Sequence, residues 1–339
     1  MVRLKDIAER SGVSVMTVSK VMRDAPDVSS ATKTRIRQMA TEMGYVPDRI
    51  AQGLRNRSTR LFGIVISAAT NPIYARMLMA IEDHAHEIGY DLIVAHSLNI
   101  PEREEMVIRR FLSRRVEGLF LVPVYRLDPT AAIYDELQKR ETPVVVLGHL
   151  APFCEKFINV DTEDTGASYA ATKHLLDLGH RRIAYFTGPP AAPSSQMRIE
   201  GYRRALREAE IELDDRLIFN AGATIEEGTK AALQMLQEAP KATAVQTVND
   251  LVAIGAANVF LAQGLRIPGD ISLVGFGNVL TSEHFRVPLT TVRQPKLRLG
   301  TAAVDIMRKL LRGEKAESVR LGAELAIRDS SGPPPKIVA

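Results

Sequence analysis

The side chains with the clearest chemical task lie close together near the N-terminus. They combine donors suited to base edges and phosphates with one flexible apolar group: Met16, Thr17, Ser19, Lys20 and Arg23. When a helix end presents such groups to a major groove, some contact base edges while their neighbours hold phosphates. Their types and spacing therefore indicate contacts with DNA.

Two short helices must position these side chains. Residues 4–23 predict a first helix with Ile7 and Ala8 on its apolar face, then a turn, then a second helix. Gly12 suits a positive φ in the turn, and Ser14 can cap the second helix. The second helix carries apolar residues on one face, at Val15, Val18, Val21 and Met22. This spacing is typical of a DNA-binding helix-turn-helix, although an ordinary solvated helical hairpin has a similar pattern.

Positive charge is concentrated around this motif. Residues 1–60 contain twelve Lys or Arg and six Asp or Glu, a net charge of +6. The rest of the chain holds 32 of the 44 basic and 34 of the 40 acidic side chains, a net charge of −2. A basic arm on a near-neutral body indicates a polyanion-binding module, the alternative being a solubility feature.

The motif is followed by a third helix and a connector. The third helix is predicted from residues 28–30, where a serine can cap it, to Met43, with Gly44 as its stop. The connector is polar, but three apolar residues share a helical face: Ile50, Ala51 and Leu54. Because Gly53 costs a helix about 1 kcal/mol and the segment is short, we expect it to order only against a partner helix and DNA.

Composition places the chain in a broad class. Its 339 residues, 45% of them hydrophobic, can bury a large core and predict more than one domain. The sequence has no apolar run typical of a signal peptide or a membrane span. Cys154, the single cysteine, excludes an internal disulfide and is more often inert packing than a reactive thiol. We therefore expect a soluble cytoplasmic protein.

The body alternates apolar strands with amphipathic helices such as residues 74–89. Strands are predicted at 61–67, 91–96, 118–122, 143–147, 183–188, 217–220, 243–248 and 271–276. Continuous apolar strands between helices favour parallel sheets covered on both faces, here in two subdomains. Ligands of such folds sit beyond the carboxyl ends of the strands. The loops predicted to meet there are 69–74, 148–149, 188–198, 249–250 and 275–280.

In combination, these features resemble the LacI family of ligand-responsive transcription repressors across nearly the whole chain. The motifs that carry the resemblance occur in the family's order: DIAERSGVSVMTVSKV, YVPDRIAQGLR, NPIY, HLLDLGHRRIAY, VND and LTTVRQP. The resemblance implies a three-helix head, a hinge helix, and a core similar to periplasmic sugar-binding proteins, working as a homodimer.

The predicted fold class is an N-terminal all-α helix-turn-helix head plus an α/β core of two doubly wound parallel-sheet subdomains. The head is expected at residues 1–46 and the hinge at 47–60. The core is expected at 61–330 and a flexible tail at 331–339. Within the core, the first subdomain would hold 61–161 plus 293–321, and the second 162–292.

The resemblance also implies roles for single residues of the head and hinge. Val15, Met16 and Lys20 match base-reading positions, and Thr17, Ser19 and Arg23 match positions that contact the backbone or flanking bases. Leu54 matches a leucine that wedges into the minor groove and kinks the duplex. The alternatives are idle helix surface for Met16 and core burial for Leu54. Replacing Leu54 by Ala should weaken specific binding more than nonspecific binding.

Seven residues of the body are predicted to contact the effector: Tyr74, His149, Asp161, Arg198, Asn249, Asp250 and Gly277. Arg198 matches the arginine that family members aim at the effector. Asn249 and Asp250 match a polar pair at the cleft, but either could instead cap the following helix. Tyr74 resembles a cleft wall, and Asp161 either contacts ligand or anchors a crossover strand.

Two departures bear on the effector's chemistry. Many sugar-binding members have aspartates where this chain has Gly148 and Gly277, and carboxylates accept hydrogen bonds from sugar hydroxyls. A cleft that lacks both of these aspartates but keeps Arg198 is expected to be less acidic than the cleft of those members. We hypothesise an anionic or partly oxidised sugar, or a small acid, as effector.

Enzymatic readings have no support in the sequence. His84 and His86 point to different sides of a helix and cannot share a metal. The sequence contains neither a phosphate-binding loop nor a nucleophile elbow. We therefore predict no enzyme, no metal and no cofactor, but a dimeric repressor of a near-palindromic operator, controlled by a small sugar or sugar acid. The rival functions are a solute receptor, an enzyme on a doubly wound fold, and an activator.

Overall fold

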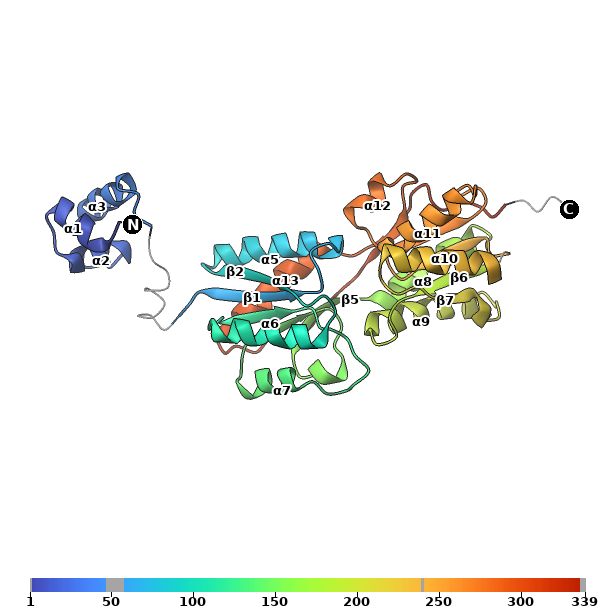
Figure 1. Cartoon of the computed structure of the whole chain (residues 1–339), viewed down its shortest axis with the longest axis horizontal. Coiled ribbons are helices and arrows are strands. Elements are labelled where there is room, and N and C mark those ends of the chain that lie inside the picture. The colour runs from blue at the N-terminus through green and yellow to red at the C-terminus, as the bar shows by residue number, and fades with distance from the viewer. Residues whose placement is uncertain (1, 47–57, 239–240, 336–339) are drawn as a thin grey trace. The chain divides into compact units, whose positions relative to one another are not determined.

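The computed structural model describes residues 2–46, 58–238 and 241–335. The chain divides into two compact units, residues 1–59 and 60–339 (Figure 1). Each unit is built around its own hydrophobic core. Within the described ranges, no helix combines the length and the apolar character needed to cross a membrane.

The described residues of the first unit form three helices, α1 (Leu4–Ser11), α2 (Val15–Met22) and α3 (Ser30–Glu42). Their shared core consists of Ile7, Ala8, Val18, Val21, Ile36 and Ala40. The predicted turn is present, with Gly12 at φ +69° and the Ser14 hydroxyl accepting a 3.1 Å hydrogen bond from the Thr17 amide. Val15, which the sequence placed on the apolar face, is instead 45% exposed.

The first sheet of the second unit is parallel throughout, with strand order β11-β5-β4-β3-β1-β2. Helices α5 (Ala75–Glu87) and α13 (Lys296–Leu311) pack on one face, and α6 (Pro101–Ser113) and α7 (Ala132–Lys139) on the other (Figure 1). The strands are β1 (Leu61–Ile66), β2 (Asp91–His96), β3 (Gly118–Leu121), β4 (Val144–Leu147), β5 (Ile158–Thr162) and β11 (Val319–Leu321).

The second sheet has strand order β12-β10-β9-β8-β6-β7, and only β12 runs antiparallel to its neighbour. Helices α8 (Asp164–Asp177) and α9 (Pro193–Glu208) cover one face, and α10 (Ile225–Glu238) and α11 (Asp250–Ala262) the other. The strands are β6 (Ile183–Thr187), β7 (Ile218–Asn220), β8 (Ala244–Thr247), β9 (Ser272–Gly277), β10 (Thr290–Arg293) and β12 (Glu324–Ala326). Short helices complete the unit: η1 (Pro72–Tyr74), η2 (Pro152–Cys154), η3 (Asp215–Leu217) and α12 (Leu280–His284).

The chain passes between the two sheets three times. It crosses from β5 to α8, returns from β10 to α13, and crosses again from β11 to β12. Because α13 packs against α5, it belongs with the first sheet although it follows a strand of the second. The four strands at these crossings form two adjacent pairs, β5 with β11 in the first sheet and β10 with β12 in the second.

A glycine allows a close contact between the two helices on one face of the second sheet. A Cβ atom added to Gly201 of α9 would lie 2.2 Å from the Thr165 carbonyl oxygen and 2.7 Å from the Tyr169 amide nitrogen of α8. Both atoms belong to backbone, so neither can move aside cheaply. Helices α8 and α9 therefore approach each other at a distance that only glycine permits.

The packed core extends beyond the predicted start of the tail. The Gly332 carbonyl oxygen lies 2.8 Å from His180 Nε2, and the Gly332 amide donates to Ser272 Oγ at 3.0 Å. Ser331 Oγ lies 2.9 Å from His174 Nε2. These backbone and side-chain contacts hold residues 331–332 on the second sheet, so the prediction of a flexible segment from residue 331 is wrong there.

Candidate functional site

The outward face of α2 carries the predicted DNA-contacting residues. Met16 is 69% exposed, and Arg23 is exposed at the C-terminal end of the helix, where its Nε donates to the Ser19 carbonyl at 3.1 Å. The Thr17 hydroxyl lies 2.9 Å from Ser14 Oγ. Lys20 is partly buried. The face therefore offers two exposed apolar side chains, Val15 and Met16, and several polar groups to a partner.

Lys20 already has a partner in this unit. Its ammonium forms an ion pair with the exposed carboxylate of Asp27, in the loop before α3. The hydrogen bond from Lys20 lowers the pKa of Asp27, which is therefore ionised at neutral pH. An ammonium has three N–H donors, so a further partner of Lys20 either shares the ammonium with this carboxylate or displaces it.

A cavity of about 250 Å³ lies in the second unit, where segments following strands of both sheets meet. All five predicted loops contribute to its wall. Of the seven predicted effector residues, six line it: Tyr74, His149, Asp161, Arg198, Asn249 and Asp250. Gly277 is adjacent, and its carbonyl accepts a hydrogen bond from Lys296 Nζ.

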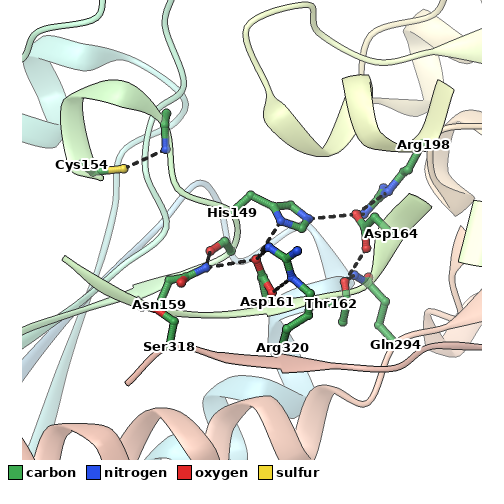
Figure 2. A network of polar contacts seen from close by, with 12 residues as sticks. His149, Cys154, Asn159, Asp161, Thr162, Asp164, Arg198, Gln294, Ser318 and Arg320 are labelled. Atoms are coloured by element: carbon green, nitrogen blue, oxygen red, sulfur yellow. Dashed lines mark hydrogen bonds and ion pairs between the residues drawn. The ribbon is translucent and has the colours of Figure 1, made fainter. Parts of the chain in front are cut away.

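Charged side chains form a network along one wall of the cavity (Figure 2). His149, which follows β4, lies between two aspartates, with Nδ1 2.9 Å from Asp161 Oδ2 and Nε2 3.2 Å from Asp164 Oδ2. Burial opposes a charge on the imidazole, but the two carboxylates raise the pKa of His149 to about 9. His149 is therefore a cation at neutral pH.

Asp161 sits on β5 and is held from several sides. Arg320 of β11 donates to both of its carboxylate oxygens, each at 2.8 Å, and Asn159 Nδ2 donates at 3.1 Å. Although burial disfavours the charge, these bonds and His149 lower the pKa of Asp161 to about 2. Bidentate Arg–carboxylate geometry of this kind fixes position as well as charge. Asp161 therefore anchors the crossover strands β5 and β11, the second of its two predicted roles.

Asp164, at the start of α8, was missed by sequence reasoning. It is fully buried and binds Arg198, whose Nη2 and Nε lie 2.7 and 2.9 Å from Asp164 Oδ2. Burial raises its pKa, but Arg198 and His149 outweigh that effect and lower it. An acidic residue in the first turn of a helix has an ordinary dipole-stabilising explanation, so the sequence held no distinctive signal for it.

Arg198 is held by several contacts within the protein. Besides Asp164, it donates through Nη1 to the Val248 carbonyl at 2.6 Å, and its guanidinium carbon lies 3.7 Å from the centre of the Phe276 ring. A guanidinium has five N–H donors. Arg198 therefore keeps donors for a ligand's hydroxyl groups, while its charge is already balanced by Asp164.

Asn249 and Asp250 both stabilise the protein itself. Asn249 caps α11, since its Oδ1 accepts from the Val252 amide at 2.8 Å, as its structural alternative predicted. The buried Asp250 carboxylate accepts from the Val279 amide at 2.9 Å and from two hydroxyls, Ser282 at 2.6 Å and Thr291 at 2.5 Å. Burial nevertheless raises the pKa of Asp250.

Backbone conformation explains the glycines at the two positions where sugar-binding members have aspartates. Gly148 has φ +128° and Gly277 has φ +130°, both in the left-handed region that strains other residues. A Cβ at Gly148 would also lie 3.1 Å from Tyr125 Oη. The cavity nevertheless holds three aspartates, so its carboxylates were not lost but lie on β5, α8 and α11.

Comparisons with known proteins decide the family. Residues 3–48 match the model of bacterial regulatory proteins of the lacI family, and residues 172–331 match that of a periplasmic binding protein-like domain. The HTH-type transcriptional repressor PurR of Aliivibrio salmonicida (strain LFI1238) is 32% identical, over 94% of each chain. The chain belongs to the LacI family.

Solved structures of this family share the fold. The lac repressor dimer bound to operator and the anti-inducer ONPF superposes with a TM-score of 0.85 at 28% identity, covering 98% of this chain and 99% of that one. The complex of the transcriptional regulator CelR with cellobiose gives 0.74 at 29% identity, covering 97% and 100%. The predicted family and fold class are confirmed. The chain is a helix-turn-helix transcriptional regulator of the repressor type with a ligand-binding core.

Proposed function

We propose that this LacI-family regulator represses transcription in the cytoplasm by binding a near-palindromic operator as a homodimer, under the control of a sugar-like or sugar-acid effector. The observation that carries the proposal is the cavity between the two sheets. Its charged groups come from elements of both sheets, such as Asp161 of β5 in the first and Arg198 of α9 and Asp250 of α11 in the second, so an occupant there contacts both subdomains. The relatives are transcriptional regulators, and we accordingly propose a regulatory role without catalysis.

In this proposal the head spans residues 1–46, and the hinge spans 47–60. Val15, Met16 and Lys20 contact base edges, with Met16 packing against an apolar group such as a thymine methyl. Thr17, Ser19 and Arg23 contact the backbone or flanking bases. Leu54, the proposed minor-groove wedge, lies outside the described residues.

The core, residues 61–330, would bind the effector between subdomains 61–161 plus 293–321 and 162–292. Arg198 donates its remaining N–H groups to the effector, and Tyr74 forms part of the cavity wall. His149, Asp161, Asn249, Asp250 and the Gly277 backbone set the cavity's shape and polarity. The CelR–cellobiose complex supports a sugar-like ligand for a core of this fold.

Exposed apolar side chains support the homodimer. β2 is an edge strand of the first sheet, and large apolar residues on it and on adjoining elements face solvent: Met79, Val94, Leu98, Ile100 and Met106. Such a group of side chains is typical of a protein–protein interface. The lac repressor structure is a dimer, and a twofold dimer requires a twofold-symmetric DNA site.

Sedimentation of variants tests the dimer. Val94→Glu places a charge at the proposed interface and should shift the protein to monomers and lower its operator affinity. The matched control is Leu127→Glu, at a more exposed leucine (82%) outside that group. Equal sedimentation of both variants and the unchanged chain would argue against this interface.

Selection of duplexes from a random pool, with and without a panel of metabolites, tests the operator proposal. Lys20→Met should weaken binding to the selected duplex about tenfold or more while changing binding to random duplex less, because a lost base contact costs about 1–3 kcal/mol. Lys139→Met, the same substitution on the exposed face of α7, is the control. Failure to enrich any sequence would refute the proposal.

A further inference from the structure

The charges around the cavity do not balance group by group. Asp164 binds Arg198 and His149, and Asp161 binds Arg320 and His149. In contrast, no carboxylate among the described residues forms a hydrogen bond or ion pair with Lys296.

Lys296 begins α13 and extends into the cavity wall. It is only 5% exposed, and its ammonium donates to the carbonyl oxygens of Gly277 and, at 3.1 Å, of Asn278. Burial lowers the pKa of Lys296 to about 8, and Arg76 and Arg293 act in the same direction. Asp250 attracts the ammonium from farther away, but its own oxygens already accept three hydrogen bonds. The amine is thus a buried donor whose charge lacks a carboxylate partner.

We propose that the effector carries a carboxylate, as in a sugar acid or another small hydroxy acid, and that Lys296 is the residue that pairs with it. This inference rests on the proposed function of the cavity as the effector site. Lys296, and not Arg198, is then the cation that favours an anionic effector, because Asp164 already neutralises the charge of Arg198. Among the described residues that line the cavity, Lys296 is the cation without a carboxylate partner, and a monoanion matches it. A phosphate dianion would bring a surplus charge close to Asp164 and Asp250, which a buried site disfavours.

The rest of the cavity suits the hydroxyls and carbons of such an acid. The Ser194 hydroxyl and the Asn71 amide nitrogen line the wall and have no hydrogen-bond partner among the described residues. Arg198 supplies further N–H donors, while apolar side chains such as Ile73 and Leu251 complete the lining. A polyhydroxylated chain ending in a carboxylate would find donors for its hydroxyls as well as for its charge.

Pairing with the acid would also change a contact between the subdomains. α13 packs with the first sheet, whereas the carbonyls of Gly277 and Asn278 lie at the C-terminal end of β9 of the second. A carboxylate that takes over the ammonium competes with these two carbonyl bonds. The acid therefore alters the connection between subdomains at the same atom that recognises it.

Calorimetry on the full-length protein tests the inference with matched probe pairs: D-gluconate and D-glucose, D-galacturonate and D-galactose, D-glycerate and glycerol. We expect at least one acid to bind about tenfold or more tightly than its neutral counterpart. Lys296→Met should weaken binding of that acid by a similar factor, because a hydrogen bond between charged groups is stronger than one between neutral groups. The control is Lys173→Met, on the exposed face of α8, which should bind the acid like the unchanged chain.

Three results would overturn the inference: no acid binds, a neutral probe binds more tightly than its acid, or Lys296→Met leaves the acid affinity unchanged. If Lys296→Met does not fold, the paired titrations of the unchanged chain decide alone. Operator selection is run in parallel on the same preparation. Sequence-specific DNA binding without an acid preference rejects this inference but leaves the proposed function standing, whereas loss of sequence-specific binding rejects the proposed function itself.

Discussion

The charge on His149 should make the stability of the core depend on pH. Burial alone would lower its pKa, but the carboxylates of Asp161 and Asp164 raise it from 6.5 to about 9. A group that holds its proton more tightly in the folded state contributes its full stabilisation below the unfolded pKa, and that contribution is lost as the pH rises through the folded value. The rise from 6.5 to about 9 corresponds to about 3 kcal/mol.

The assay compares the unchanged chain with His149→Gln by urea unfolding at a series of pH values. Far-ultraviolet circular dichroism is the readout, because the chain contains no tryptophan. The free energy of unfolding should differ by about 3 kcal/mol near pH 6, and the difference should shrink steadily up to about pH 9.5.

The difference in unfolding free energy between the two chains at each pH cancels the contribution of titrating groups that both chains contain. Lys296 is one such group, because its lowered pKa makes the fold more stable as the pH rises from about 8 to 10.5, the opposite sign to His149. A difference that stays constant between pH 6 and 9.5 would refute the assignment of a buried cation at His149.

Three further substitutions test the packing and the charges. Asp164→Asn leaves Arg198 and His149 without their shared anion and should cost about 3–5 kcal/mol of unfolding free energy, whereas Asp177→Asn, in an exposed pair, should cost less than about 1. Gly201→Ala should destabilise the core or prevent its folding, while Gly322→Ala, with open space around its Cβ position, should be nearly neutral in the same urea titration. Ser14→Ala removes the cap of α2 and should lower the free energy of unfolding of the head by about 1 kcal/mol, measured by thermal unfolding; no change in the melting temperature would contradict the cap's role.

The strands that could be predicted are apolar runs, buried in β1 and β4 and partly exposed in the edge strand β2. β1 and β4 are continuous apolar runs, and this is the pattern that a parallel sheet covered by helices imposes. β5 escaped prediction because it carries two polar residues, Asn159 and Asp161. Asn159 donates to the Gly148 carbonyl in the preceding loop, and Asp161 accepts from Arg320, which is 159 residues away along the chain. β11 and β12 are three residues long, too short to show any period.

The candidate site was predictable to the extent that topology determines it. Loops at the carboxyl ends of parallel strands converge, and the predicted loops do line one cavity. Asp164 and Lys296 were missed because each begins a helix, where a charged residue is ordinarily solvated. From the sequence, Arg198 is the cation that favours an anionic effector. The sequence could not show that a buried aspartate, Asp164, already neutralises the charge of Arg198.

The ion pair between Lys20 and Asp27 bears on how a regulator searches a genome. An ammonium kept near a carboxylate gains less from an arbitrary phosphate or a wrong base, because the bond it gives up is of similar strength. A well-aligned guanine edge, with its O6 and N7 acceptors, would compensate for the loss of the ion pair with Asp27. Asp27 would thereby shorten the residence time at incorrect DNA sites more than at the correct site. A single acidic side chain in a basic module would then increase sequence specificity at the expense of overall affinity.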